Sequence, residues 1–282
     1  MGYGIYGSEK RDATINKYSH RKFTKSNCMD WLDTLEDGSV NLWIIDPPYN
    51  VLTGNMKNKN GAAVFHSRYT AQVTPSESDM EKGMVTPRFE VAIPWEEQAK
   101  LEDYREWCYS WYCKAHAKLV DDSFMFIFWS MKYLYLAYQI FDVNRVIFWQ
   151  QPNMISSISG DFCYDITPII VVRKGNARLN KEAGLWDKSS VLNFTKPQGN
   201  YKDDKLCHPT QKPRKLLEHL VWLSDADHEG YVIGDFFAGS GSLLRAVNKA
   251  DVILCDLNDE YYDKFFDIYV TDERIYRCEK IK

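Results

Sequence analysis

The chain has 282 residues, a hydrophobic content of 45%, a charged content of 26% and a formal net charge of −4. These values are typical of a globular protein, and this length can bury the core of one large α/β domain, which we expect to span residues 1–282. The weakly acidic balance gives no global attraction for nucleic acid, so binding to such a partner requires a local basic patch.

The cysteines and the apolar runs exclude further classes of protein. Seven cysteines without a Cys-x-x-Cys pair argue against a disulfide framework and against a zinc site, and no metal ion is expected. No apolar run reaches the roughly 18 residues that suggest a membrane span. The first residues lack the charged start and apolar core of a signal peptide. We therefore expect a cytoplasmic protein.

The chain opens with residues 1–22, which show no clear period and carry several Lys and Arg side chains. They are either an arm that contacts phosphates or a solvated tail. The spacing of apolar residues then predicts a short strand over 23–27 and a helix over 28–36.

A strand followed by two prolines is the most informative stretch. Val40–Ile45 is an apolar run rich in β-branched and aromatic residues, which indicates a buried strand of a parallel sheet. Pro47 and Pro48 then end the strand and fix an extended turn. Asp46 and Tyr49 are thereby held at the end of the strand, where open α/β sheets place their ligands.

This turn suits methylation of an exocyclic amino group. Asp46 and the carbonyl of Pro47 could each accept one N–H of the amine, so that its lone pair points at an electrophilic methyl group. The ring of Tyr49 offers a flat face against which a flipped base can stack. An ordinary strand-end turn with Asp46 as a cap is the alternative that this motif alone leaves open.

Residues 51–95 contain many Gly, Pro and polar residues and are predicted to be a loop insertion. Because this loop leaves the end of the candidate strand, we expect it to close over a base or to lie along DNA. A mobile loop without a specific role is the alternative. Its candidate contacts are Lys57, Lys59, His66 and Arg68.

Alternating helices and strands follow, which is typical of a mostly parallel sheet. The patterns predict a helix over 96–119, a strand over 124–129, a helix over 130–141, and strands over 145–149 and 169–172. Residues 174–207 are irregular and carry many Lys and Arg side chains, so they could supply the local basic patch that the net charge lacks. An exposed loop of mixed charge is the alternative.

Two further turns lie late in the chain. His208-Pro209-Thr210-Gln211-Lys212-Pro213 precedes a predicted helix over 214–223. A strand over 231–237 leads into Ala238-Gly239-Ser240-Gly241, where glycines let the backbone approach a ligand. A helix over 242–249 is predicted next, with free N–H groups at its start. The following strand, 251–256, ends in Asp256, which lies about 20 positions after Asp235, the spacing of a ribose-binding acid. A last helix is predicted over 261–269.

Together these motifs resemble those of the DNA amino-methyltransferases, which methylate adenine N6 or cytosine N4 with S-adenosylmethionine. The resemblance spans about residues 23–266. It is carried by Asn27-Cys28, Asp46-Pro47-Pro48-Tyr49-Asn50, His208–Pro213 and Asp235–Gly241, in the order of the family's β group. It implies a Rossmann-like methyltransferase fold of the α/β class, with a mostly parallel sheet, helices on both faces and irregular DNA-contacting insertions. It also implies that residues 174–207 are the candidate target-recognition segment.

The resemblance also implies roles for single residues. The catalytic residues would be Asp46, Pro47, Pro48 and Tyr49. The residues that bind the cofactor S-adenosylmethionine would be Asn27, Cys28, Asp46, His208, Thr210, Lys212, Asp235, Phe237, Ala238, Gly239, Ser240, Gly241, Asp256 and Leu257. Phe236 stands where the family commonly has proline.

The resemblance further implies site-specific methylation of flipped-out adenine at N6, because Asp at position 46 accompanies adenine more often than Ser does. Cytosine N4 methylation and a non-catalytic DNA- or cofactor-binding protein are the alternatives. The implied partner is double-stranded DNA, with a homodimer and a cognate restriction endonuclease left open. The expected location is the cytoplasm of a prokaryotic cell or of a phage-infected host.

Other classes of protein fit less well. A dinucleotide-dependent oxidoreductase would place glycine where Leu244 stands, and it would leave Asp46 and the two prolines unexplained. A P-loop is excluded because no Lys-Ser or Lys-Thr pair follows Gly241. Methylation of RNA or of a protein amide remains open, since the turn would recognise a planar amine rather than a whole polymer.

Overall fold

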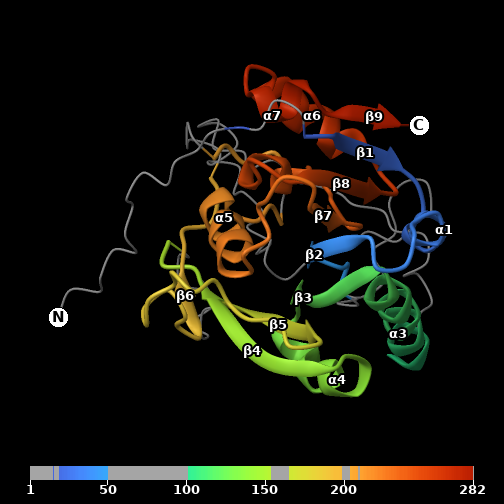
Figure 1. The fold of residues 1–282 in the computed structure, drawn as a ribbon, viewed down its shortest axis with the longest axis vertical. Helices are drawn as coiled ribbons and strands as arrows, with labels where there is room; N and C mark the ends of the chain where they lie inside the picture. The colour runs from blue at the N-terminus through green and yellow to red at the C-terminus, as the bar shows by residue number, and fades with distance from the viewer. Residues whose placement is uncertain are drawn as a thin grey trace, which may run out of the picture.

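The computed structural model describes residues 15, 19–49, 101–153, 165–198, 204–208 and 210–281. Its strands form one sheet in the order β6-β4-β5-β3-β2-β7-β8-β1-β9 (Figure 1). The strands are β1 (Arg21–Lys25), β2 (Val40–Ile45), β3 (Leu119–Phe128), β4 (Val143–Gln150), β5 (Ile166–Lys174), β6 (Val191–Asn193), β7 (Val232–Asp235), β8 (Asp251–Asp256) and β9 (Glu279–Ile281). The helices are α1 (Cys28–Asp33), α3 (Leu101–Lys118), α4 (Leu134–Ile140), α5 (Arg214–Leu223), α6 (Glu260–Tyr269) and α7 (Glu273–Tyr276), with 3₁₀ helices η2 (Met131–Tyr133) and η3 (Ser242–Ala246).

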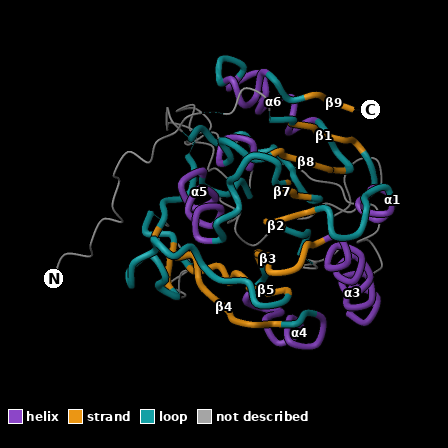
Figure 2. Tube along the Cα trace, viewed as in Figure 1, coloured by secondary structure: helices purple, strands orange, loops and turns teal. Residues whose placement is uncertain are grey.

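The sheet is mostly parallel, as predicted. Only β5 runs against its neighbours, pairing antiparallel with both β3 and β4, and the other described pairings are parallel. Strands β1, β2, β3, β7 and β8 therefore end at the same edge of the sheet, which we call the carboxyl edge. Figure 2 shows how the loops that leave this edge join strands to helices. The arrangement is that of a Rossmann-like α/β fold.

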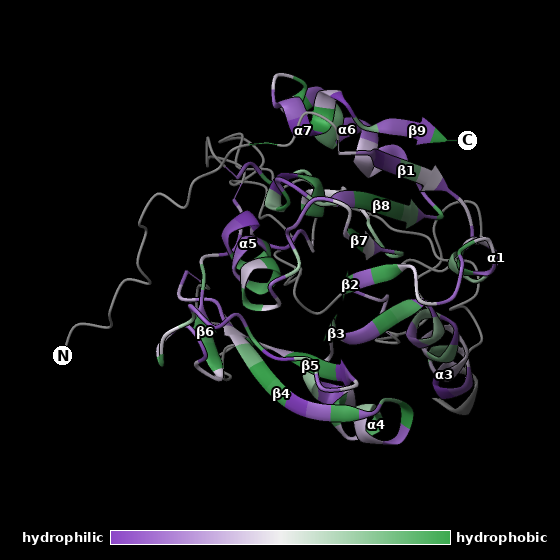
Figure 3. Ribbon diagram, viewed as in Figure 1, coloured by the Kyte–Doolittle hydropathy of each residue, from purple (hydrophilic) through white to green (hydrophobic). Residues whose placement is uncertain are grey.

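Helices cover both faces of the sheet because the central strands are apolar on both sides. Leu42 and Ile44 of β2 belong to a first core cluster, which also contains side chains of α5, η3 and α6. Trp43 and Ile45 point the other way, into a second cluster formed with α1, α3 and α4. Figure 1 shows α5 on one side of the sheet and α1 and α3 on the other, and Figure 3 shows β8 as largely hydrophobic.

Trp43 of β2 packs against the neighbouring strand β7. Its ring lies directly over Gly234 of β7, where an added Cβ would come within 2.1 Å of the ring atom Cζ3. The indole N–H donates to the carbonyl of Ala115 in α3 at 3.0 Å, and Phe236 packs edge-on against the ring at 5.1 Å between centroids. Phe236, which replaces the family's usual proline, is thus a core residue of the second cluster. A side chain larger than hydrogen has no room at position 234.

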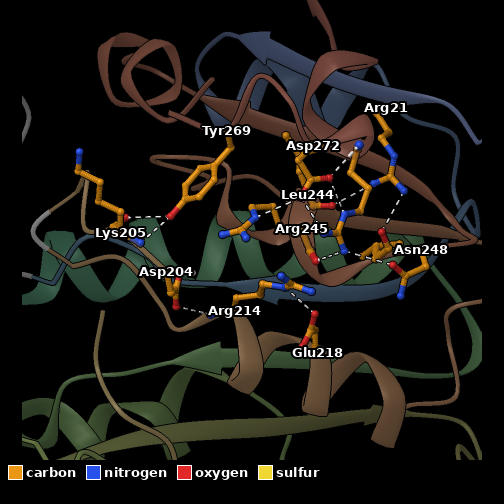
Figure 4. A network of polar contacts seen from close by, with 12 residues as sticks. Arg21, Asp204, Lys205, Arg214, Glu218, Leu244, Arg245, Asn248, Tyr269 and Asp272 are labelled. Carbon is orange, nitrogen blue, oxygen red and sulfur yellow. Dashed lines mark hydrogen bonds and ion pairs between the residues drawn. The ribbon is translucent and has the colours of Figure 1, made fainter. Parts of the chain in front are cut away.

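The helix predicted over 242–249 is wrong. The chain forms only the short 3₁₀ helix η3, and Val247 is already extended. Guanidinium groups take the place of the missing helical hydrogen bonds, because Arg21 donates to the carbonyls of Leu244 and Val247, and Arg274 donates to that of Arg245 (Figure 4). The prediction failed because these donors come from β1 and α7, far away in the sequence.

Asp227 completes the same arrangement, since its carboxylate accepts the backbone N–H groups of residues 248, 249 and 250. Asp272 accepts from Arg274 at 2.7 Å and from Arg245 at 3.3 Å. Burial raises the pKa of Asp272, but its hydrogen bonds and charge interaction with Arg274 outweigh this and hold the pKa at about 2. The segment after the glycine turn is therefore fixed by charged groups rather than by a helix.

Most other predicted elements are confirmed, with shifted ends. The first strand is Arg21–Lys25 rather than 23–27, and the long helix is Leu101–Lys118, with residues 96–100 outside the described ranges. β6, α7 and β9 were not predicted, because each has only three or four residues. The loop insertion 51–95, including Lys57, Lys59, His66 and Arg68, lies outside the described residues, as does most of the segment 1–22. None of the described helices combines the length and apolar composition that crossing a bilayer requires.

Candidate active site

Asp46 is held at the carboxyl edge, directly after β2, by contacts to both of its carboxylate oxygens. The hydroxyl of Tyr49 donates to Oδ1 at 2.7 Å. The ammonium of Lys212 forms an ion pair with Oδ2. The carbonyl of Pro48 accepts a hydrogen bond from the hydroxyl of Tyr104 in α3 at 3.2 Å. The predicted catalytic turn thus has a defined shape rather than being a free loop.

Aromatic rings form a wall beside this turn. The ring of Tyr49 meets that of Trp129 edge-on at 6.4 Å between centroids, and Tyr104 lies nearly parallel to Trp129 at 6.1 Å. Trp129 follows β3, the neighbour of β2, so the wall rises from the same edge of the sheet. The sequence did not connect Tyr104 or Trp129 with the site, because their proximity to it depends on strand order.

The turn from His208 to Lys212 lies next to the Asp46 turn. Besides pairing with Asp46, the ammonium of Lys212 donates to the carbonyl of Thr210 at 3.1 Å and lies 4.8 Å from the ring centre of Phe128. Lys212 was predicted to bind the cofactor. In the structure its ammonium contacts the predicted catalytic acid.

His208 connects this turn to the glycine turn. Its ring packs edge-on against Tyr261 at 4.3 Å, and its Nε2 atom lies 3.5 Å from where a Cβ on Gly239 would be. The backbone N–H of Thr210 donates to Nδ1 at 3.2 Å, so the neutral ring carries its proton on Nε2. Burial, together with the positive charges of Lys212 and Lys264, lowers the pKa of His208 to about 3. His208 is therefore an uncharged N–H donor at this edge.

The glycine turn after β7 is shaped by two acids. The backbone N–H of Phe237 donates to Asp235 at 2.9 Å, and that of Gly239 donates to Asp256 at 2.7 Å. Gly239 and Gly241 have φ angles of +51° and +80°, which residues other than glycine rarely adopt. Asp256 also accepts the N–H of Asn258 at 2.9 Å. The predicted ribose-binding acid thus also holds the predicted cofactor turn in place.

Carboxyl groups gather at this edge. Burial raises the pKa of Asp235 well above its usual range, and the nearby carboxylates of Asp46 and Asp256 add to the rise. Burial also raises the pKa of Asp256, although its backbone N–H donors oppose this. Carboxyl groups whose charged forms are disfavoured, as those of Asp235 and Asp256 are, suit a ligand that brings a positive charge and hydroxyl donors. Within the described residues, the site therefore fits the cofactor expected from the resemblance.

The remaining predicted residues lie around the ends of β1 and β8. The side-chain oxygen of Asn27 accepts the N–H of Met29 at 2.8 Å and caps α1, which leaves its amide N–H₂ for other partners. Cys28 is buried, and burial raises the pKa of its thiol to about 12. Leu257 is 52% exposed. Ala238 and Ser240 are buried in the glycine turn.

The candidate recognition segment 174–207 divides between the two edges of the sheet. Lys174 ends the antiparallel strand β5 and donates to the carbonyl of Leu119 at the start of β3, far from Asp46. Lys196 lies at the carboxyl edge, because its backbone N–H and carbonyl both bond to the side chain of Asn153, just after β4, at 2.8 and 2.9 Å. Only the later part of the segment therefore reaches the candidate site.

Comparisons with known proteins agree with this geometry. The model of a DNA methylase family, that of N6 and N4 methyltransferases, matches residues 40–267. The type II methyltransferase M.HpaI of Haemophilus parainfluenzae is 24% identical over 286 residues, which cover 90% of this chain and 78% of that protein.

Solved structures show the same fold. The M1.HpyAVI–SAM complex matches with a TM-score of 0.56 and 17% identity, over 88% of this chain and 98% of the other. The PvuII DNA methyltransferase, described as cytosine-N4-specific, matches with a TM-score of 0.57 and 15% identity, over 95% of this chain and 99% of the other.

Proposed function

Because this chain belongs to the DNA methylase family of N6 and N4 methyltransferases, which depend on S-adenosylmethionine, we propose that it methylates the N6 amino group of adenine in double-stranded DNA at a specific site. The observation that carries the proposal is the carboxylate of Asp46, fixed at the carboxyl edge by Tyr49 and Lys212 beside an aromatic wall. A carboxylate accepts N–H donors, as this chemistry requires.

In this mechanism the chain orients the amine and does not form a covalent bond to it. Asp46 and the carbonyl of Pro47 each accept one N–H of the flipped adenine, which turns the nitrogen lone pair toward the methyl donor. Tyr49 supplies a ring against which the base packs, which offsets part of the cost of flipping, a few kcal/mol. The buried ring of Trp129 contacts that of Tyr49 edge-on and so helps to fix it. Proximity and orientation supply much of the acceleration.

The residues that would hold the cofactor are those of the glycine turn, with Asp235, Asp256 and His208 around it. When bound, S-adenosylmethionine supplies an electrophilic methyl group, whose bond to sulfur breaks with its electron pair going to sulfur as the amine lone pair forms the new N–C bond. The amine then loses one proton to water. His208 is uncharged and so adds no repulsion toward a cationic ligand.

The test is to incubate the purified protein with unmodified genomic DNA and S-adenosylmethionine and to map modified bases by modification-sensitive sequencing. We expect N6-methyladenine at one short recurring sequence. N4-methylcytosine at such a sequence would refute the choice of base but keep the reaction. An absence of modified bases, with cofactor binding demonstrated by calorimetry, would overturn the proposed function.

Cytosine N4 is the second candidate, because the PvuII enzyme with the same fold is described as cytosine-N4-specific. The relatives named as type II methyltransferases support a role in restriction-modification, and we propose the cytoplasm of a bacterial or phage-infected cell as its location. Two further partners remain to be tested. Analytical ultracentrifugation would show a homodimer, and an endonuclease gene next to the gene for this protein would indicate a cognate restriction enzyme.

Replacing Asp256 with Ala is expected to weaken cofactor binding by about 10- to 100-fold, the range of a hydrogen bond to a charged group. The change removes the proposed ribose acceptor and also the acceptor of the Gly239 N–H. Titration calorimetry with S-adenosylhomocysteine measures the effect. An unchanged dissociation constant would remove Asp256 from the cofactor site.

Replacing Lys196 with Ala is expected to weaken DNA binding and to lower the slope of log affinity against log salt by about one. Burial lowers the pKa of Lys196, and the nearby positive charge of Lys212 lowers it further. A phosphate placed beside Lys196 would therefore favour the charged form of this lysine. Fluorescence anisotropy with a short duplex between about 50 and 200 mM salt measures the slope.

The matched control for Lys196 is Lys181→Ala. Lys181 is exposed and follows Asn180, whose backbone N–H bonds to the last residue of α5 at the opposite edge of the sheet. This variant should keep the salt dependence of the unchanged protein. Equal losses in the two variants would mean that DNA does not lie preferentially on the carboxyl edge.

A further inference from the structure

Lys212 is placed to act on Asp46 rather than on a ligand. Its side chain is 10% exposed and that of Asp46 is 19% exposed, so water screens their ion pair only in part. The ammonium is itself fixed, by the carbonyl of Thr210 at 3.1 Å and by the ring of Phe128 at 4.8 Å. These contacts leave the ammonium little freedom to turn toward another partner.

We propose that Lys212 is a positioning residue that holds the carboxylate of Asp46 in place, aimed at the amino group of the target base. This inference rests on the proposed function, because it assigns a role within that reaction. It departs from the resemblance-based expectation that Lys212 binds the cofactor. Tyr49 shares this role, because Tyr49 donates to Oδ1 of Asp46 and Lys212 pairs with Oδ2.

The need for such a cation follows from the groups that face Asp46. These are Tyr49 from its own turn, Lys212 from the turn before α5, and Asp235 from the end of β7. Of these three, Lys212 is the one that carries a positive charge. Without its ammonium, Oδ2 of Asp46 loses the donor that holds it, and the carboxylate can turn away from the amine.

The two donors also fix the rotation of the carboxylate. An ionised carboxylate offers about four lone-pair positions, so the contacts from Tyr49 and Lys212 leave acceptor positions for an N–H of the base. In this role Asp46 is an acceptor that orients the amine, and the proton released by the methylated amine passes to water.

The experiment compares Lys212→Met, which has a similar length without charge, with Lys212→Arg, which keeps the charge. Lys212→Met should lower kcat by about 100-fold at neutral pH, the cost of a misplaced reacting group. Its binding of S-adenosylhomocysteine, measured by calorimetry, should change little. Lys212→Arg should recover most of kcat, because it restores a cation that can hold Oδ2 of Asp46.

A double-mutant cycle with Asp46→Asn shows whether the two residues act together. In the Asp46→Asn background there is no carboxylate for the ammonium to hold, so the added Lys212→Met change should lower kcat by no more than a few-fold. A full further loss would overturn the proposal. So would weakened binding of S-adenosylhomocysteine in Lys212→Met, which would place Lys212 in the cofactor site.

Failure of this inference can be told apart from failure of the proposed function. If the unchanged protein methylates cytosine N4, the base assignment fails, while the same cycle on that base still decides the role of Lys212. If the unchanged protein modifies no DNA, the proposed function and the role within it are both overturned. If it methylates adenine and Lys212→Met retains kcat, only the inference fails.

Discussion

Replacing Asp46 with Ala is expected to lower the rate of methyl transfer by about 10³-fold, the upper range for removing one group that stabilises a transition state. The change deletes the acceptor for the amine and also the partner of both Tyr49 and Lys212. Single-turnover kinetics with labelled S-adenosylmethionine and a duplex containing the mapped site measure the rate.

Asp46→Asn is the matched control, because it keeps the shape and one acceptor oxygen but not the charge. We expect its rate of methyl transfer to lie between that of the Ala variant and that of the unchanged protein. Both variants should bind S-adenosylhomocysteine within about three-fold of the unchanged protein, which is less than 1 kcal/mol. A larger loss of cofactor binding would mean that Asp46 shapes the cofactor site and does not act mainly on the base.

Replacing Gly234 with Ala is expected to lower the free energy of unfolding by about 3 kcal/mol, the upper part of the usual range for an overpacked core. The added Cβ would lie 2.1 Å from Cζ3 and 2.6 Å from Cε3 of Trp43. The ring cannot easily move away, since it is fully buried, bonded to Ala115, and in contact with Trp31 and Phe236. Urea denaturation followed by circular dichroism measures the change.

Gly184→Ala is the control for this substitution. Its Cβ would meet only the side chain of Asp187, at an ordinary distance of 3.5 Å, so stability should change by about 0.5 kcal/mol or less. Combining Gly234→Ala with Trp43→Phe removes the ring atoms that clash and should recover part of the loss. If Gly234→Ala were as stable as the control, the close packing of β2 on β7 would be contradicted.

The sequence predicted those parts of the fold that depend on local pattern. The apolar runs of β2, β3 and β8 and the helical period of α5 were enough to place these elements, because the pattern of apolar residues within each segment indicates which side chains are buried. The antiparallel direction of β5 was not predicted, since nothing in its composition reports the direction of its neighbours. The helix after Gly241 was predicted wrongly, because Arg21 and Arg274 satisfy its carbonyls from distant elements.

The candidate site shows the same division. Motif order was sufficient to predict that the Asp46 turn, the His208–Lys212 turn and the glycine turn would meet at one edge. It could not predict that Lys212 would pair with Asp46, because a motif reports residue types and not which atoms of neighbouring turns come together. Tyr104 and Trp129 were missed for a related reason, since an aromatic residue in a core pattern gives no sign that its ring also borders a site.

The guanidinium contacts around η3 also bear on how the protein is made. Arg21 is separated by 223 residues from Leu244, whose carbonyl it binds, and Arg274 follows 29 residues after its acceptor Arg245. During synthesis, Arg21 cannot make this contact until Leu244 has also left the ribosome. Contacts of such high sequence separation form late and slow folding. We therefore expect the segment beside the glycine turn to be among the last to order, so that a nascent chain binds no cofactor before Arg274 has been made.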